Sequence, residues 1–123
     1  KRDDDNGKSE IVGIIGDVKG KKAILVDDII NTATTICGAA NELLKEGATE
    51  IYACATHGIF SEQAVEVLKN TPFTEVIITD TIEIPENKKF DKLTILSTDT
   101  LFAETIKRVS SDQSISDLFI RKE

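Results

Sequence analysis

The fold of this chain is decided by one stretch, Ala23-Ile24-Leu25-Val26-Asp27-Asp28-Ile29-Ile30-Asn31-Thr32-Ala33-Thr34-Thr35. An apolar run ends in two adjacent carboxylates, and hydroxyl-bearing residues then lead into a segment with helical periodicity. This layout predicts a buried parallel strand followed by a helix. Two carboxylates at the end of such a strand can bind adjacent hydroxyls of a sugar, and the N–H groups that open the next helix can face an anion. The stretch therefore predicts a sugar-phosphate site.

β-rich runs and helical segments alternate along the rest of the chain. Strands are predicted over residues 10–15, 22–26, 51–55, 76–78 and 93–96. The first helix follows the opening stretch, because its apolar residues recur at i, i+3, i+4, i+7 and i+8 from Ile36, and Gly47 stands where a helix ends. A second helix is predicted with Ser61 as its N-cap and an end near residues 70–72, and a third helix is predicted over residues 101–109.

The alternating order predicts an α/β fold with a parallel sheet whose ligand-binding loops lie at the carboxyl ends of the strands. Residues 81–92, which contain Pro85 and several charges, are predicted to form a solvated loop. Residues 1–10 combine charged residues with Gly7, a composition that favours a frayed terminus.

The composition restricts the class of function. At 123 residues the chain is expected to form one domain, and its formal charge of −7 argues against nonspecific binding to nucleic acid or to a membrane surface. An anionic substrate would then need local N–H donors and bridging Mg²⁺. No apolar run approaches the roughly 20 residues of a membrane span, and no signal-peptide pattern is present, so a cytoplasmic location is expected. Cys37 and Cys54 lack metal-ligand spacing and are interpreted as small buried hydrophobes.

The opening stretch resembles the motif that binds phosphoribosyl diphosphate (PRPP), in which two acids and two apolar residues precede Asp-Thr-Ala-Gly-Thr. The motif alone is also compatible with the phosphoribosyltransferases. Further matches favour the PRPP synthetases (ribose-phosphate diphosphokinases), and they follow the order of that family from end to end of the chain. These matches are Lys1-Arg2, residues 14–21, Gly47-Ala48-Thr49, residues 55–61, residues 79–82 and residues 114–119.

The resemblance implies an α/β fold of the type I phosphoribosyltransferase kind, a parallel-sheet βαβ sandwich. It also implies that residues 1–123 are the single C-terminal, ribose-5-phosphate-binding domain of a two-domain synthetase whose N-terminal half supplies most ATP and metal contacts. Residues 1–10 would be part of a flexible catalytic loop. The whole enzyme would use Mg²⁺ and form a homo-oligomer, and no metal ligand is assigned within this chain.

The family also assigns roles to the motif residues. Asp27 and Asp28 would hold the 2- and 3-hydroxyls of ribose 5-phosphate, so that its anomeric hydroxyl attacks the β-phosphorus of ATP and expels AMP. The 5-phosphate would lie in a loop formed by Asn31, Thr32, Ala33, Thr34 and Thr35. Lys1 and Arg2 match a loop whose cations stabilise charge in the transition state.

Three residues depart from the family pattern. Asp3 stands in place of a second arginine, which would place a carboxylate near phosphates. Asn31 replaces an aspartate. Thr34 replaces a glycine, and a β-branched residue would be strained there if the loop requires a positive φ.

Two other parts of the sequence can be interpreted in terms of function. Ser114, Ile115 and Ser116 resemble a segment that joins a neighbouring subunit in an allosteric phosphate or ADP site; the same segment also fits a tail anchored by Leu118 and Phe119. His57, the only histidine, is interpreted as a packing or interface residue.

Three alternative functions share part of this sequence pattern. A catalytically silent subunit that regulates active partners agrees with the three departures, whereas Lys1 and the paired acids favour activity. A phosphoribosyltransferase agrees with the motif alone. A phospho-acceptor receiver domain also has paired acids and an acid like Asp80 after a strand, but here the acids follow the second predicted strand and the required late lysine is missing.

Overall fold

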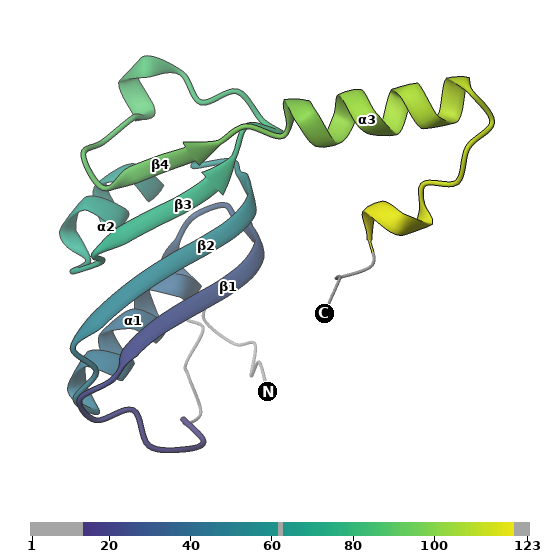
Figure 1. Ribbon diagram of the computed structural model, residues 1–123. Coiled ribbons are helices and arrows are strands. Elements are labelled where there is room, and N and C mark those ends of the chain that lie inside the picture. Colours follow the sequence, from purple (N-terminus) through teal and green to yellow (C-terminus); the bar gives the residue numbers. More distant parts are fainter. Residues whose placement is uncertain (1–13, 62, 120–123) are drawn as a thin grey trace, which may run out of the picture.

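The computed structural model describes residues 14–61 and 63–119, which form a parallel α/β fold (Figure 1). Its four strands lie in the order β1-β2-β3-β4, and each neighbouring pair is parallel. The strands are β1 (Lys22–Ile30), β2 (Glu50–Gly58), β3 (Glu75–Thr79) and β4 (Leu93–Leu96). The helices are α1 (Thr34–Lys45), α2 (Ala64–Asn70) and α3 (Asp99–Ser110), with the short 3₁₀ helices η1 (Glu86–Lys88) and η2 (Ser116–Leu118).

The core lies between the sheet and one layer of helices. Figure 1 shows α1 and α2 behind the same face of the sheet, and both contribute buried side chains to the core. On the strands, Ile51, Val76 and Ile78 are completely buried against them. The opposite face of the sheet is open: Ile24 is 65% exposed and Val26 is 79% exposed.

The predicted α/β alternation is confirmed, with some corrections. The strand predicted over residues 10–15 lies mostly outside the described residues, and at its described end Ile14 and Ile15 are not in a strand. The segment 81–92 is not simply solvated, because Ile84 is buried and the Phe90 ring lies 6.2 Å from the Phe60 ring. Its apolar residues therefore anchor it to the core.

Helix α3 matches its predicted range but extends away from the sheet (Figure 1). None of its residues is buried. Cys37 is buried as expected, whereas Cys54, on the open face, is only half-buried. Within the described residues, no helix is long and apolar enough to cross a membrane.

Candidate functional site

The paired acids lie in solvent at the carboxyl end of β1. Leu25 before them is half-buried and Ile30 after them is only 2% exposed, whereas Asp27 and Asp28 are both exposed. The Asp28 N–H donates a hydrogen bond of 2.9 Å to the Asp27 carboxylate. Because Ile30 anchors the end of the strand in the core, the two carboxylates are held in place while their remaining oxygens stay accessible to a ligand.

The turn between β1 and α1 is built on Ala33. This residue has φ 65° and ψ 0°, is almost fully buried, and accepts the first helical hydrogen bond from the Cys37 N–H at 3.0 Å. The positive φ therefore falls on Ala33 and not on Thr34, which is the first residue of α1. The backbone strain expected at Thr34 is absent, and its hydroxyl instead donates to the Thr32 hydroxyl at 3.2 Å.

The start of α1 has the properties of an anion site. The first N–H groups of a helix have no intrahelical acceptor and carry the positive end of the helix dipole. The first turn of α1 contains no acidic residue, and Ala33 provides no side-chain cap. The hydroxyl groups of Thr32 and Thr34 lie on the same turn. A phosphate bound here would face backbone donors and hydroxyls without a nearby helical carboxylate.

A second loop supports this turn. The Ser61 hydroxyl donates to the Asn31 side-chain oxygen at 2.5 Å, and the Ser61 N–H donates to the Asn31 carbonyl at 3.1 Å. The Ile59 N–H donates to the Ile30 carbonyl at 2.9 Å. The loop after β2 therefore fixes the loop after β1. An aspartate at position 31 would accept the same hydroxyl hydrogen bond, so the departure at Asn31 leaves this link in place.

The structure corrects the role predicted for Ser61. Helix α2 begins at Ala64 with Gln63 as its N-cap, so Ser61 does not cap it. Sequence analysis missed the link to Asn31, although one signal was present. Both polar residues follow strands that were predicted to belong to one parallel sheet, and the carboxyl ends of such strands share one edge.

A polar network continues along the same edge. His57 Nδ1 lies 2.8 Å from the Thr81 hydroxyl oxygen. The Thr79 hydroxyl donates to the Thr56 carbonyl at 2.6 Å and also lies 3.1 Å from the Thr81 hydroxyl. The register pairs His57 with Ile29, one residue after the acids. His57 is thus half-buried and held by a hydrogen bond, in agreement with a packing role.

Asp80 joins the ends of β3 and β4. Its carboxylate accepts hydrogen bonds from the Thr98 hydroxyl at 2.6 Å, the Thr98 N–H at 2.8 Å and the Ser97 hydroxyl at 3.0 Å. These bonds favour the ionised form, the Thr98 hydroxyl most strongly, and lower the pKa of Asp80 below its ordinary value of 3.8. The side-chain partners of this carboxylate, Ser97 and Thr98, immediately precede α3, so Asp80 positions the start of that helix.

The predicted site residues separate into three groups. The residues of the proposed sugar-phosphate site all lie at the end of β1 and the start of α1: Asp27, Asp28, Asn31, Thr32, Ala33, Thr34 and Thr35. Lys1 and Arg2 lie outside the described residues. The third group, residues 114–116, lies beyond α3 and away from the sheet (Figure 1).

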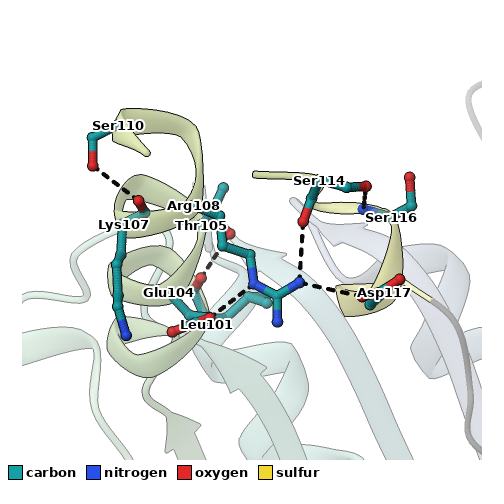
Figure 2. A network of polar contacts seen from close by, with 9 residues as sticks. All are labelled: Leu101, Glu104, Thr105, Lys107, Arg108, Ser110, Ser114, Ser116 and Asp117. Atoms are coloured by element: carbon teal, nitrogen blue, oxygen red, sulfur yellow. Dashed lines mark hydrogen bonds and ion pairs between the residues drawn. The ribbon is translucent and has the colours of Figure 1, made fainter. Parts of the chain in front are cut away.

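The segment of the third group is held by Arg108 (Figure 2). Arg108 donates to the Ser114 carbonyl at 3.1 Å, pairs with Glu104 at 2.8 Å and lies 3.7 Å from the Asp117 carboxylate. The Ser116 N–H donates to the Ser114 hydroxyl at 3.1 Å. The guanidinium group is thus already shared between two carboxylates, and an allosteric anion site at Ser114, Ile115 and Ser116 stays a prediction.

A divalent cation in this protein would need carboxylate ligands from the described side chains. Across residues 14–61 and 63–119, no three His, Cys, Asp or Glu side chains converge as a metal site. Mg²⁺ commonly uses one or two carboxylates together with substrate phosphates. The exposed pair Asp27 and Asp28 fits such a shared arrangement, but the described residues do not form a complete protein cage.

The fold and the strand-end site define an α/β protein of the phosphoribosyltransferase type, and comparisons with known proteins agree. The family described as phosphoribosyl synthetase-associated domain matches residues 6–120. The chain therefore belongs to this family, which confirms the resemblance to PRPP synthetases inferred from the motifs.

Individual relatives give the same result. Ribose-phosphate pyrophosphokinase of Caldanaerobacter subterraneus subsp. tengcongensis is 59% identical over 111 residues, which are 90% of this chain and 35% of the relative. The Nostoc sp. protein of the same name is 50% identical over 97% of this chain and 36% of its own length. The crystal structure of phosphoribosylpyrophosphate synthetase from Mycobacterium smegmatis has a TM-score of 0.78 and 46% identity, covering 80% of this chain and 33% of that one. The chain thus spans about a third of the length of these relatives.

Proposed function

We propose that this chain is the ribose-5-phosphate-binding part of a ribose-phosphate pyrophosphokinase. The whole enzyme would transfer the diphosphate group of ATP to ribose 5-phosphate and release PRPP and AMP. The observation that carries the proposal is the arrangement at the end of β1, where the exposed acids Asp27 and Asp28 are followed, after residues 29–32, by the Ala33 turn and the start of α1. Carboxylates suited to sugar hydroxyls and N–H groups suited to a phosphate thereby lie close together in one short segment of the chain, from Asp27 to the first turn of α1.

Different residues would bind the sugar and the phosphate of ribose 5-phosphate. Asp27 and Asp28 would accept hydrogen bonds from two ribose hydroxyls and so orient the sugar. The 5-phosphate would lie against the first N–H groups of α1 and the hydroxyls of Thr32 and Thr34. The Ser61 hydroxyl would keep the phosphate loop in position through Asn31. Correct orientation of the anomeric hydroxyl is the main contribution that this part of the protein can make to the reaction.

The other requirements of the reaction would come from outside the described residues. Lys1 and Arg2 would stabilise charge on the transferring diphosphate, and most ATP contacts would belong to the two thirds of the relatives that this chain does not match. Mg²⁺, when bound, would neutralise phosphate charge. The 123-residue chain by itself is proposed to be inactive, and the whole protein is proposed to be cytoplasmic and to form a homo-oligomer.

The direct test is calorimetric titration of the chain with ribose 5-phosphate and with PRPP, each in the presence of Mg²⁺. Saturable binding that unphosphorylated ribose does not reproduce is the expected result. The double variant Asp27→Ala, Asp28→Ala should lose this binding and keep its circular dichroism spectrum. Asp91→Ala, which removes another exposed acid, is the matched control and should bind like the unmodified chain. Unchanged affinity in the double variant would refute the site assignment.

A second candidate is a catalytically silent regulatory subunit. Asp3 favours it, because a carboxylate stands where the family has a phosphate-binding arginine. Asn31 also agrees with this candidate, because it lacks the carboxylate of the family's aspartate, although it keeps its link to Ser61. Thr34 has an ordinary helical backbone and therefore adds no backbone strain. The two candidates can be distinguished in a chimera in which this chain replaces the matched third of the Caldanaerobacter relative. The measurement is the release of AMP from ATP in the presence of ribose 5-phosphate. A chimera that binds ribose 5-phosphate but releases no AMP would favour the silent subunit.

A further inference from the structure

Phe60 has an unusual backbone conformation for a large side chain. Its φ is 49°, in the left-handed region that bulky L residues rarely adopt. Among the non-glycine residues that the structure describes, only Ala33 and Asp112 also have a positive φ. Ala33 forms the turn of the proposed phosphate loop. Phe60 immediately precedes Ser61, which hydrogen-bonds to Asn31 in that loop. Two of these three conformations therefore flank the link between the two site loops.

The left-handed turn at Phe60 changes the direction of the N–H groups in the loop after β2. In an extended strand, successive N–H groups point to opposite sides, so only every second one can reach the same neighbouring strand. Here three successive N–H groups reach the end of β1. Those of Ile59 and Phe60 donate to the Ile30 carbonyl at 2.9 and 3.3 Å, and that of Ser61 donates to the Asn31 carbonyl at 3.1 Å. The turn therefore brings both the N–H and the hydroxyl of Ser61 to Asn31.

Core packing holds Phe60 in this conformation. Its side chain is completely buried. Its ring centroid lies 6.2 Å from that of Phe90 at an interplanar angle of 57°, within the range of favourable aromatic pairs. A Cβ on Gly58 would lie 3.2 Å from Cζ of Phe60, so the ring passes close to the backbone of β2. A strained conformation persists only where the surrounding structure permits no alternative, and the close packing around this ring meets that condition.

Phe90 connects a third segment to the same loop. It belongs to the connection between β3 and β4, in which Ile84 is also buried in the core. The contacts then run from Phe90 to the Phe60 ring, and from the adjacent Ser61 to Asn31. The position of the phosphate loop after β1 thus depends on side chains from the loop after β2 and from the segment after β3.

We infer that Phe60 is a positioning residue for the 5-phosphate of ribose 5-phosphate. Its ring anchors the left-handed turn that directs Ser61 to Asn31, and Asn31 fixes the start of the phosphate loop. Phe90 supports the ring. Because its side chain is completely buried, Phe60 acts through Ser61 and not by contact with the ligand. This inference rests on the proposed function, since it concerns the same site.

The first test is calorimetric titration of the 123-residue chain with ribose 5-phosphate and Mg²⁺. Phe60→Leu keeps an apolar side chain but loses the ring, and it should weaken binding about two- to fivefold, as expected for the loss of one supporting hydrogen bond. Phe73→Leu is the matched control, because Phe73 is also buried but precedes β3 at the opposite end of the parallel strands. Both variants should lose stability in urea, but Phe73→Leu should keep the affinity of the unmodified chain. Equal weakening of binding by both variants would overturn the inference.

A double variant tests the route through Ser61. Ser61→Ala removes the hydroxyl that the turn directs to Asn31, so its effect on affinity and that of Phe60→Leu should not multiply when the two are combined. A loss equal to the product of the single losses would show that Phe60 acts by another route. Phe90→Leu leaves Phe60 in place and should weaken binding about twofold. It replaces Phe60→Leu in each comparison should that variant not fold, and unchanged affinity would then overturn the inference.

Amide hydrogen exchange measured by NMR gives a readout without ligand. The Ser61 amide, which donates to the Asn31 carbonyl, should exchange at least about threefold faster in Phe60→Leu than in the unmodified chain and in Phe73→Leu. Failure of the unmodified chain to bind ribose 5-phosphate would refute the proposed function, and the exchange rate would still show whether Phe60 holds Ser61 against Asn31. Unchanged exchange of the Ser61 amide in Phe60→Leu would overturn the inference.

Discussion

Thr98 donates both its N–H and its hydroxyl to the same Asp80 oxygen, at 2.8 and 2.6 Å, so the end of β3 determines where α3 begins. The contact joins residues that are 18 positions apart in the sequence. It is also the strongest cause of the lowered pKa of Asp80, and therefore makes the stability of this region dependent on pH.

The first prediction concerns that dependence. A carboxyl whose pKa is lower in the folded protein stabilises the fold above its unfolded pKa and loses this effect as pH falls through the folded value. For Asp80, the stabilisation should be complete near neutral pH and should be lost as the pH falls from the ordinary pKa of 3.8 through the lower pKa of the folded protein. We expect the unfolding free energy, measured in urea between pH 6 and pH 2.5, to fall more steeply in the unmodified chain than in Asp80→Asn. Parallel curves of unfolding free energy against pH would contradict the prediction. Other acids also contribute to the pH dependence; the pKa of Glu104, for example, is lowered, mainly by Arg108. Comparing the two proteins removes this shared contribution.

The second prediction concerns the link between the two site loops. Removing either partner in Asn31→Ala or Ser61→Ala should destabilise the chain, and a double-mutant cycle should give a coupling of about 0.5–1 kcal/mol. Both single variants should also weaken ribose 5-phosphate binding about two- to fivefold, because the phosphate loop loses its support. Asn31→Asp is the control, since its carboxylate accepts the same hydroxyl hydrogen bond. Additive effects of Asn31→Ala and Ser61→Ala in urea unfolding would show that the link is unimportant.

The third prediction separates the backbone roles of Ala33 and Thr34. A β-branched residue is strained at positive φ, so Ala33→Val should lower the unfolding free energy by roughly 1–3 kcal/mol. Thr34→Gly should destabilise by only a few tenths of a kcal/mol, because it places glycine in the first turn of α1. Urea unfolding of the two variants tests this. A Thr34→Gly variant more stable than the unmodified chain would place the strained position at residue 34 instead.

The fourth prediction concerns Gly58 at the end of β2. A Cβ at this position would lie 2.6 Å from Cδ1 of Ile78, which is completely buried. Gly58→Ala should therefore cost about 1–3 kcal/mol of unfolding free energy through overpacking. Ile78→Val removes the clashing methyl group, so Gly58→Ala should cost less when introduced into Ile78→Val. An equal cost in both backgrounds, measured by urea unfolding, would indicate that another contact is responsible.

Much of the fold could be predicted because hydrophobic pattern and local backbone preference agree. The run before Asp27 predicts β1, and the stripe from Ile36 predicts α1, where Gly47 has the expected positive φ. The strand at residues 93–96 was predicted at its observed bounds. Ser61 was misassigned because a serine before a helix is a common cap, and only the position of the neighbouring loop shows that Asn31 takes its hydroxyl.

The class of fold, the order of the elements and the position of the candidate sugar-phosphate site follow from local sequence, because paired acids, a turn and a helix start lie close together along the chain. The contacts between distant segments emerge only in the folded chain: Asn31 with Ser61, His57 with Thr81, and Asp80 with Thr98. Such contacts depend on which strands lie side by side and in which register. The folded structure also shows that α3 extends away from the sheet and leaves its apolar residues exposed, because periodicity identifies an apolar face but does not identify the surface that covers it.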